Sequence, residues 1–151
     1  MRALSGLAEA LALAAAALLL ALAVLTVADV AGRGLLGSPI LGYHDVAGLA
    51  SAVAVAGFFP LLALRGGHIV LRPFAALRAG RFLDALGGIA TAAFFALMAW
   101  QYVGFSAEMW SSGERMIVLR WPVAPFWWGV TALVGLTALA AAVVALRRRP
   151  D

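Results

Sequence analysis

Four long uncharged apolar runs fill most of this chain, and they limit its possible folds more than any other feature. The runs are Ala10–Ala28, Val46–Leu64, Ala85–Ala107 and Trp121–Leu146, which contain 19, 19, 23 and 26 residues. None of the 11 basic and 7 acidic residues lies inside them. Because a helix rises about 1.5 Å per residue, roughly 20 apolar residues cross a hydrocarbon core of about 30 Å. The pattern therefore predicts an all-α integral membrane bundle of four transmembrane helices.

The composition argues against a soluble protein. The 151-residue chain is 65% hydrophobic and 12% charged, with a mean hydropathy of +1.02. A soluble domain carries about 25% charged residues, and a soluble helical bundle needs polar outer faces that these runs lack. Two prolines, Pro122 and Pro125, place the start of the last helix near residue 126. We therefore expect residues 1–151 to form a single transmembrane domain, with helices at about 10–28, 46–64, 85–107 and 126–146.

The positions of the arginines predict how the helices are oriented. All 11 basic residues are Arg. Eight arginines lie at the termini or between the second and third runs: Arg2, Arg65, Arg72, Arg78, Arg81, Arg147, Arg148 and Arg149. The other two connections hold only Arg33, Arg115 and Arg120. The positive-inside rule then predicts that both termini are cytoplasmic, and the basic charge indicates orientation rather than binding of nucleic acid.

The first run also resembles a signal peptide in its basic start. Its apolar stretch is longer than the roughly 7–15 residues of a cleaved signal. We expect a retained helix.

The chain offers little from which to build a catalytic or metal site. It has no cysteine, and it lacks P-loop, GxSxG and HExxH motifs. Its two histidines, His44 and His68, are predicted on opposite sides of the membrane, roughly 36 Å apart along a helix, so one haem cannot bridge them. The most polar side chain inside a run is Gln101, which is either a satisfied structural amide or a hydrogen-bonding group for another helix. We expect a non-enzymatic protein with no cofactor or metal.

Several features instead suggest contacts with a partner or with lipid. Gly48, Ala52 and Ala56 follow one another at four-residue spacing, which lets helix backbones approach closely in lipid. Four tryptophans surround the second outer connection: Trp110, Trp121, Trp127 and Trp128. They indicate an aromatic belt at headgroup level or a contact surface for another protein.

Charged residues near the helix ends suggest two further contacts. Asp29 and Arg33 stand four residues apart and can pair if the first helix continues that far. Arg65, His68 and Arg72 follow the second run, where they can cap the helix end or hold the cytoplasmic loop against a partner or anionic lipid. Residues 65–84 are expected to lie at the membrane interface.

Three loop segments resemble those of TRAP transporter small membrane subunits, the Q component. The first is Arg33 followed by GSPILGYHDV (residues 37–46), which is similar to the family's Arg, Gly-x-Pro-Ile and acidic residue. The second is RGGHIV (65–70), and the third is Gly-Glu at 113–114 followed by LRWP at 119–122. These motifs occur in order at the ends of the four runs. Two departures are Asp45, where the family usually has Glu, and Leu71-Arg72, where an acidic residue is usual.

The resemblance implies a tripartite secondary transporter of the bacterial inner membrane. It implies two protein partners: a large membrane subunit that carries the substrate and coupling-ion sites, and a periplasmic protein that captures an organic acid. Transport would be driven by a sodium gradient acting on the large subunit, and the small subunit would brace that subunit. The candidate contacts with partner or lipid are Arg33, Asp45, Gly48, Ala52, Ala56, Arg65, His68, Arg72, Trp110 and Trp121. The alternative is a membrane anchor or cytochrome-like subunit of a redox complex, and an independent channel is disfavoured because no polar helix face lines a pore.

Overall fold

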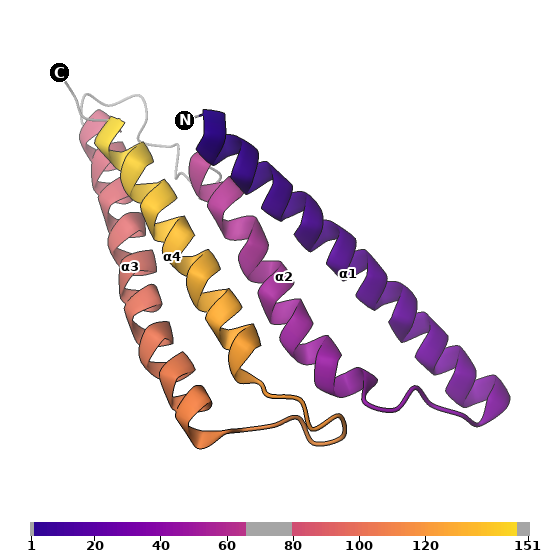
Figure 1. Ribbon diagram of the computed structural model, residues 1–151. Coiled ribbons are helices and arrows are strands. Elements are labelled where there is room, and N and C mark those ends of the chain that lie inside the picture. The colour runs from indigo at the N-terminus through magenta and orange to yellow at the C-terminus, as the bar shows by residue number, and fades with distance from the viewer. Residues whose placement is uncertain (1, 66–79, 148–151) are drawn as a thin grey trace.

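The structure is a computed structural model that describes residues 2–65 and 80–147, with side chains described at 3–65 and 86–146. This part of the chain forms four helices, drawn in Figure 1: α1 (Arg2–Leu36), α2 (Tyr43–Arg65), α3 (Gly80–Ser112) and α4 (Ala124–Arg147). Each corresponds to one of the apolar runs and is long and apolar enough to cross a membrane. The expected fold class, all-α with four transmembrane helices, is confirmed.

The helices are longer than the runs that predicted them. α1 has 35 residues and α3 has 33, so each is about 50 Å long at 1.5 Å per residue. As a result, Asp29 and Glu108, each one residue beyond an expected helix end, lie within helices. α4 begins at Ala124 rather than near residue 126, because Pro125 fits in the first turn, where its missing N–H leaves no helical hydrogen bond unmade.

The four helices form an open row rather than a closed ring. α1 packs on α2, α2 on α4 and α4 on α3, so the order across the row is α1–α2–α4–α3 (Figure 1). α1 and α2 lie close together near the start of α1 and separate toward the loop that joins them (Figure 1). The start of α1 and the end of α4 lie at the same end of the molecule, as an even number of spans requires.

Small residues allow α1 and α2 to pack closely. A Cβ atom added to Gly57 would lie 3.0 Å from the Cβ of Ala15. Ala50 and Ala54 are buried and share the helix face of Gly57 by their spacing. The α2–α1 contact therefore uses small residues, but along a different face from the predicted Gly48, Ala52 and Ala56 series.

The main core lies where α2, α3 and α4 meet. Ala56 of α2 is buried against Val130 and Val134 of α4. Phe59 of α2 meets Phe95 of α3, with ring centroids 5.7 Å apart. Thus α2 and α4 are the inner helices, while α1 and α3 leave large apolar side chains open to the surroundings. These exposed side chains suit a lipid or protein environment rather than water.

Candidate functional site

The last two turns of α1 hold a buried carboxylate, Asp29, which lies one residue beyond the predicted end of the first helix. Asp29 is only 2% exposed. Its Oδ1 accepts a hydrogen bond from the Ile40 N–H at 2.7 Å, and its Oδ2 accepts one from Arg33 at 2.6 Å. The Asp29–Arg33 pairing follows the predicted four-residue spacing. The carboxylate therefore fastens the loop of residues 37–42 to α1, and Arg33 is engaged within the chain while remaining half exposed.

Tyr43 makes a second link between α1 and α2. Its hydroxyl is hydrogen-bonded to the Thr26 hydroxyl and donates to the Leu22 carbonyl at 3.3 Å. The long Tyr side chain reaches across the space where the two helices have begun to separate. Nothing in the sequence pattern distinguished Tyr43 from an interfacial aromatic residue.

Asp45 joins the start of α2 to the distant loop between α3 and α4. Its Oδ2 accepts hydrogen bonds from the N–H groups of Val118 at 2.6 Å and Leu119 at 3.1 Å. Next to it, Gly42 has a φ of 77°, and a Cβ atom there would lie 2.5 Å from the Leu119 side chain. The α1–α2 loop and the α3–α4 loop are therefore docked on each other. Asp45, predicted as a contact with a partner or lipid, thus accepts hydrogen bonds within the chain.

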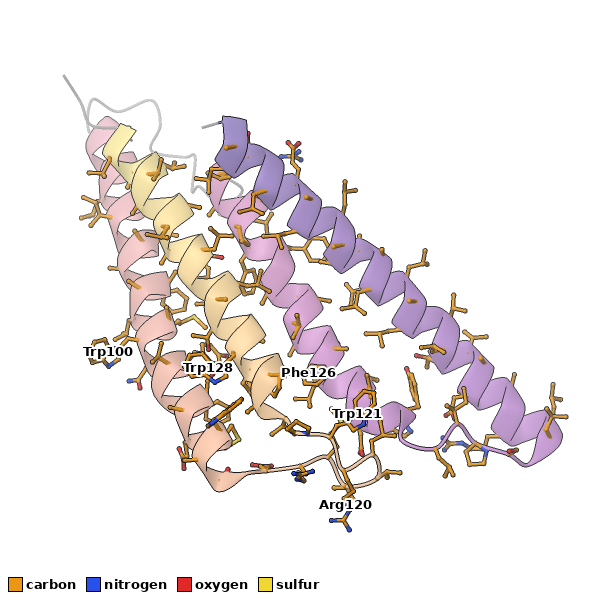
Figure 2. The ribbon with its side chains drawn as sticks, in the orientation of Figure 1. Trp100, Arg120, Trp121, Phe126 and Trp128 are labelled. Carbon is orange, nitrogen blue, oxygen red and sulfur yellow. The ribbon has the colours of Figure 1, made fainter. Side chains whose placement is uncertain are left out.

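The α3–α4 loop (residues 113–123) is a compact turn. The Met116 N–H donates to the Trp121 carbonyl at 2.8 Å, and the Val123 N–H donates to the Glu114 carbonyl at 3.1 Å. Met116 is buried beneath the turn, whereas Ile117 at its tip is 85% exposed. Arg120 projects away from the helices (Figure 2). The loop thus presents apolar and basic side chains from a backbone held by its own hydrogen bonds.

The tryptophans do not form one uniform group. Trp110 and Trp121 are 67% and 58% exposed, so both are open to headgroups or to a partner. Trp127 instead packs inside the chain, where it stacks on Tyr102 and meets Phe105 edge-on at 4.8 Å. Trp100, which lies in the middle of α3, projects from the side of that helix away from α4 (Figure 2). Of the tryptophans expected around the second outer connection, Trp110 and Trp121 are therefore exposed, whereas Trp127 packs within the chain.

At the opposite end, Arg65 pairs with Glu9 of α1 at 3.4 Å, and both side chains are exposed. An exposed pair of this kind contributes little stability. Arg65 therefore remains exposed, and its predicted contact with a partner or lipid stays a prediction. His68, Arg72 and most of the predicted interfacial segment lie outside the described residues.

The predicted small-residue series divides among different environments. Ala56 is buried in the core, Ala52 is half buried against it, and Gly48 is exposed. Gly48 and Ala52 border a groove of about 410 Å³ between α2 and the α3–α4 pair. Trp127 and Val130 of α4 also line this groove. Ala56, at one end of the series, thus packs inside the protein, whereas Gly48, at the other end, lies on an open surface.

A buried hydroxyl pair joins α3 to α4 within the membrane-spanning part. Ser106 and Thr131 are hydrogen-bonded at 2.8 Å, and Ser106 is fully buried. Thr131 also donates to the Trp127 carbonyl of its own helix at 2.9 Å. Among the described residues, no group of three or more His, Cys, Asp or Glu side chains is placed to hold a metal ion. The open features are apolar helix faces and grooves, which are suited to contact with lipid or with other helices.

These features define a multi-pass membrane protein whose polar groups mostly fasten its own helices and loops together. Residues 22–150 match the family described as tripartite ATP-independent periplasmic transporters, DctQ component. The chain belongs to this family and is the small subunit of a TRAP transporter, as the loop motifs predicted. No curated protein and no solved structure matches it.

Proposed function

We propose that this chain is a scaffold that braces the large membrane subunit of its TRAP transporter, without itself forming the transport path. The large subunit carries the substrate and the coupling ion, and a periplasmic binding protein delivers an organic acid to it. The driving force is a sodium gradient. The proposal places the chain in the bacterial inner membrane with both termini in the cytoplasm.

The proposal rests on the partners of the ionisable groups, which lie within the chain itself. Transport paths usually keep ionisable side chains inside the bilayer. In the described part of the chain, the one buried carboxylate is Asp29, and it is occupied by the Ile40 N–H and by Arg33 near the end of α1. The core between α2, α3 and α4 is built from Ala, Val and aromatic side chains. An ion or organic anion would find no charged side chain among these described residues.

The open row supports the same proposal. A closed bundle buries its best packing faces on itself, whereas in the described part of the chain this row leaves the outer faces of α1 and α3 without a partner helix. Apolar transmembrane faces associate through close packing and interhelical hydrogen bonds. A larger membrane protein can use such a row as an added layer.

Co-purification tests the scaffold role. The cognate large subunit, tagged and expressed with this chain, should retain it through detergent extraction in a fixed stoichiometry. The large subunit expressed alone should be less stable to heat than the complex. A large subunit that is equally stable alone, and that does not retain this chain, would contradict the proposal.

A further inference from the structure

One face of α3 carries a regular stripe of large side chains. Its members are Phe94, Leu97, Met98, Gln101, Tyr102 and Phe105. The spacing of three and four residues places them on one side of a helix. Together they line a shallow groove of about 330 Å³. Met98 and Tyr102 are half buried against the core, while Phe94, Leu97, Gln101 and Phe105 remain exposed.

Gln101 is the unusual member of this stripe. It lies within one helical turn of the middle of the membrane-spanning segment Leu86–Ser112. None of the hydrogen bonds found among the described residues involves its side-chain amide, although the buried hydroxyls of Ser106 and Thr131 are both paired. The hydrocarbon core supplies no water to satisfy an exposed amide. The aliphatic hydroxyls of α3 all have partners, whereas the Gln101 amide and the hydroxyl of the neighbouring Tyr102 have none among the described residues.

The groove on α3 continues onto α2. Met98 and Tyr102 also line the second groove, whose α2 border includes Gly48, Ser51 and Ala52. The two grooves therefore form one surface, called here the α2–α3 face. Small side chains on its α2 side let another helix approach closely, and large side chains on its α3 side can interdigitate with that helix.

We propose that a transmembrane helix of the large subunit docks on the α2–α3 face and places a side chain with both a donor and an acceptor, such as Asn, Gln, Ser or Thr, against Gln101. This inference rests on the proposed scaffold function. The amide NH₂ donates and its oxygen accepts, so a partner of this chemistry satisfies both. Lipid tails offer neither group at that depth. Membership of a component family in a tripartite transporter favours the large subunit over a second copy of this chain.

Photo-cross-linking locates the partner directly. Benzoylphenylalanine is placed at Leu97 on the α2–α3 face, and in a matched variant at Leu20 on α1. The two leucines are 62% and 67% exposed, so they differ in face rather than in accessibility. Both variants are co-expressed with the cognate large subunit in membranes and irradiated. The Leu97 variant should form an adduct with the large subunit, and the Leu20 variant should form little.

The amide is tested separately in the Leu97 cross-linking background. Gln101→Leu removes the donor and acceptor but keeps a similar size and suits a lipid-facing helix, so the chain should still fold. The yield of the adduct between this chain and the large subunit, measured with the large subunit in limiting amount, should fall about 3- to 20-fold. This is the range expected for the loss of one interhelical hydrogen bond in a membrane. Gln101→Asn should restore part of the yield because it keeps the amide.

Other results would overturn this inference, with or without the scaffold function. An adduct between two copies of this chain at Leu97 would show that a second copy occupies the face and would overturn the inference. A complex that co-purifies but cross-links only from Leu20 would place the large subunit on another face. A Leu97 adduct whose yield is insensitive to Gln101→Leu would show that the large subunit does not bind the amide. Either result would overturn the inference while leaving the scaffold function intact. Failure of the two chains to co-purify at all would contradict both the scaffold function and this inference.

Discussion

Replacing Asp45 with Ala should release the α3–α4 loop from the start of α2. One carboxylate oxygen accepts two backbone hydrogen bonds, at 2.6 Å from Val118 and 3.1 Å from Leu119. A hydrogen bond to a charged group contributes about 1.5–3 kcal/mol net. Because Asp45 is only partly buried, water compensates for part of the loss. We therefore expect the loop to be destabilised by about 1.5–3 kcal/mol in total.

Hydrogen–deuterium exchange measures this change where it occurs. Each 1.4 kcal/mol is a tenfold change in an equilibrium, so amides at Val118 and Leu119 should exchange about 10- to 100-fold faster in Asp45→Ala than in the unmodified protein. The measurement is made on protein in lipid nanodiscs, with peptides from the middle of α4 as internal references. Those peptides should not change, because the core around Val134 does not involve the loop.

Two further variants control for charge and for nonspecific effects. Asp45→Asn keeps an acceptor oxygen without the charge and should give an intermediate rate. Glu108→Ala removes an exposed carboxylate of α3 whose side chain accepts no hydrogen bond from any described residue, and it should leave loop exchange unchanged. Equal loop exchange in Asp45→Ala and the unmodified protein would refute the docking of the α3–α4 loop on the start of α2.

Three more expectations can be checked with standard measurements. Gly42→Ala should reduce the free energy of unfolding by about 1–2 kcal/mol, and so lower the thermal unfolding midpoint, because it forces a side chain into a left-handed conformation. Gly48→Ala should leave the midpoint unchanged, because a Cβ atom added there meets nothing within 4 Å. Ser106→Ala should cost about 0.5–1 kcal/mol, since its hydroxyl partner keeps a second acceptor in its own helix; no loss would show that the pair is unimportant. Reporter fusions should read periplasm after Gly37 and cytoplasm after Asp151, and the reverse pattern would overturn the orientation predicted from the arginines.

The number and type of helices could be predicted because both follow from hydropathy and length, which act locally along the chain. The residues at which the helices begin and end were harder to predict. α1 continues through Asp29 and Arg33 because each neutralises the other, so two charges did not end the helix. α4 starts earlier because a proline is tolerated in a first turn. Such endings depend on partners that a run of apolar residues does not reveal.

The packing of the helices could not be read from the sequence. Alanine and glycine are so frequent that several helix faces qualify as small-residue faces, and only the structure shows that Gly57 rather than Gly48 meets α1. The Asp45 contact joins residues more than 70 positions apart. No spacing rule links such positions. By contrast, the Asp29–Arg33 pair was predictable because its four-residue spacing is local.

The loop motifs predicted the family correctly, but their residues act in a way that the sequence did not indicate. Arg33 and Asp45 were predicted as contacts with a partner or lipid. In the structure Arg33 pairs with Asp29 of its own helix, and Asp45 accepts hydrogen bonds from the α3–α4 loop. The motif residues therefore fix the positions of the α1–α2 and α3–α4 loops relative to the helices.

Reconstituted uptake tests the central claim most directly. Proteoliposomes with an inward sodium gradient are prepared with the large subunit alone, with this chain alone and with both, each in the presence of the periplasmic binding protein loaded with its organic acid. The scaffold account predicts substrate accumulation with both subunits, slower or no accumulation with the large subunit alone, and none with this chain alone. Sodium-dependent accumulation by this chain alone would contradict the account, because it would show that the chain itself contains a transport path.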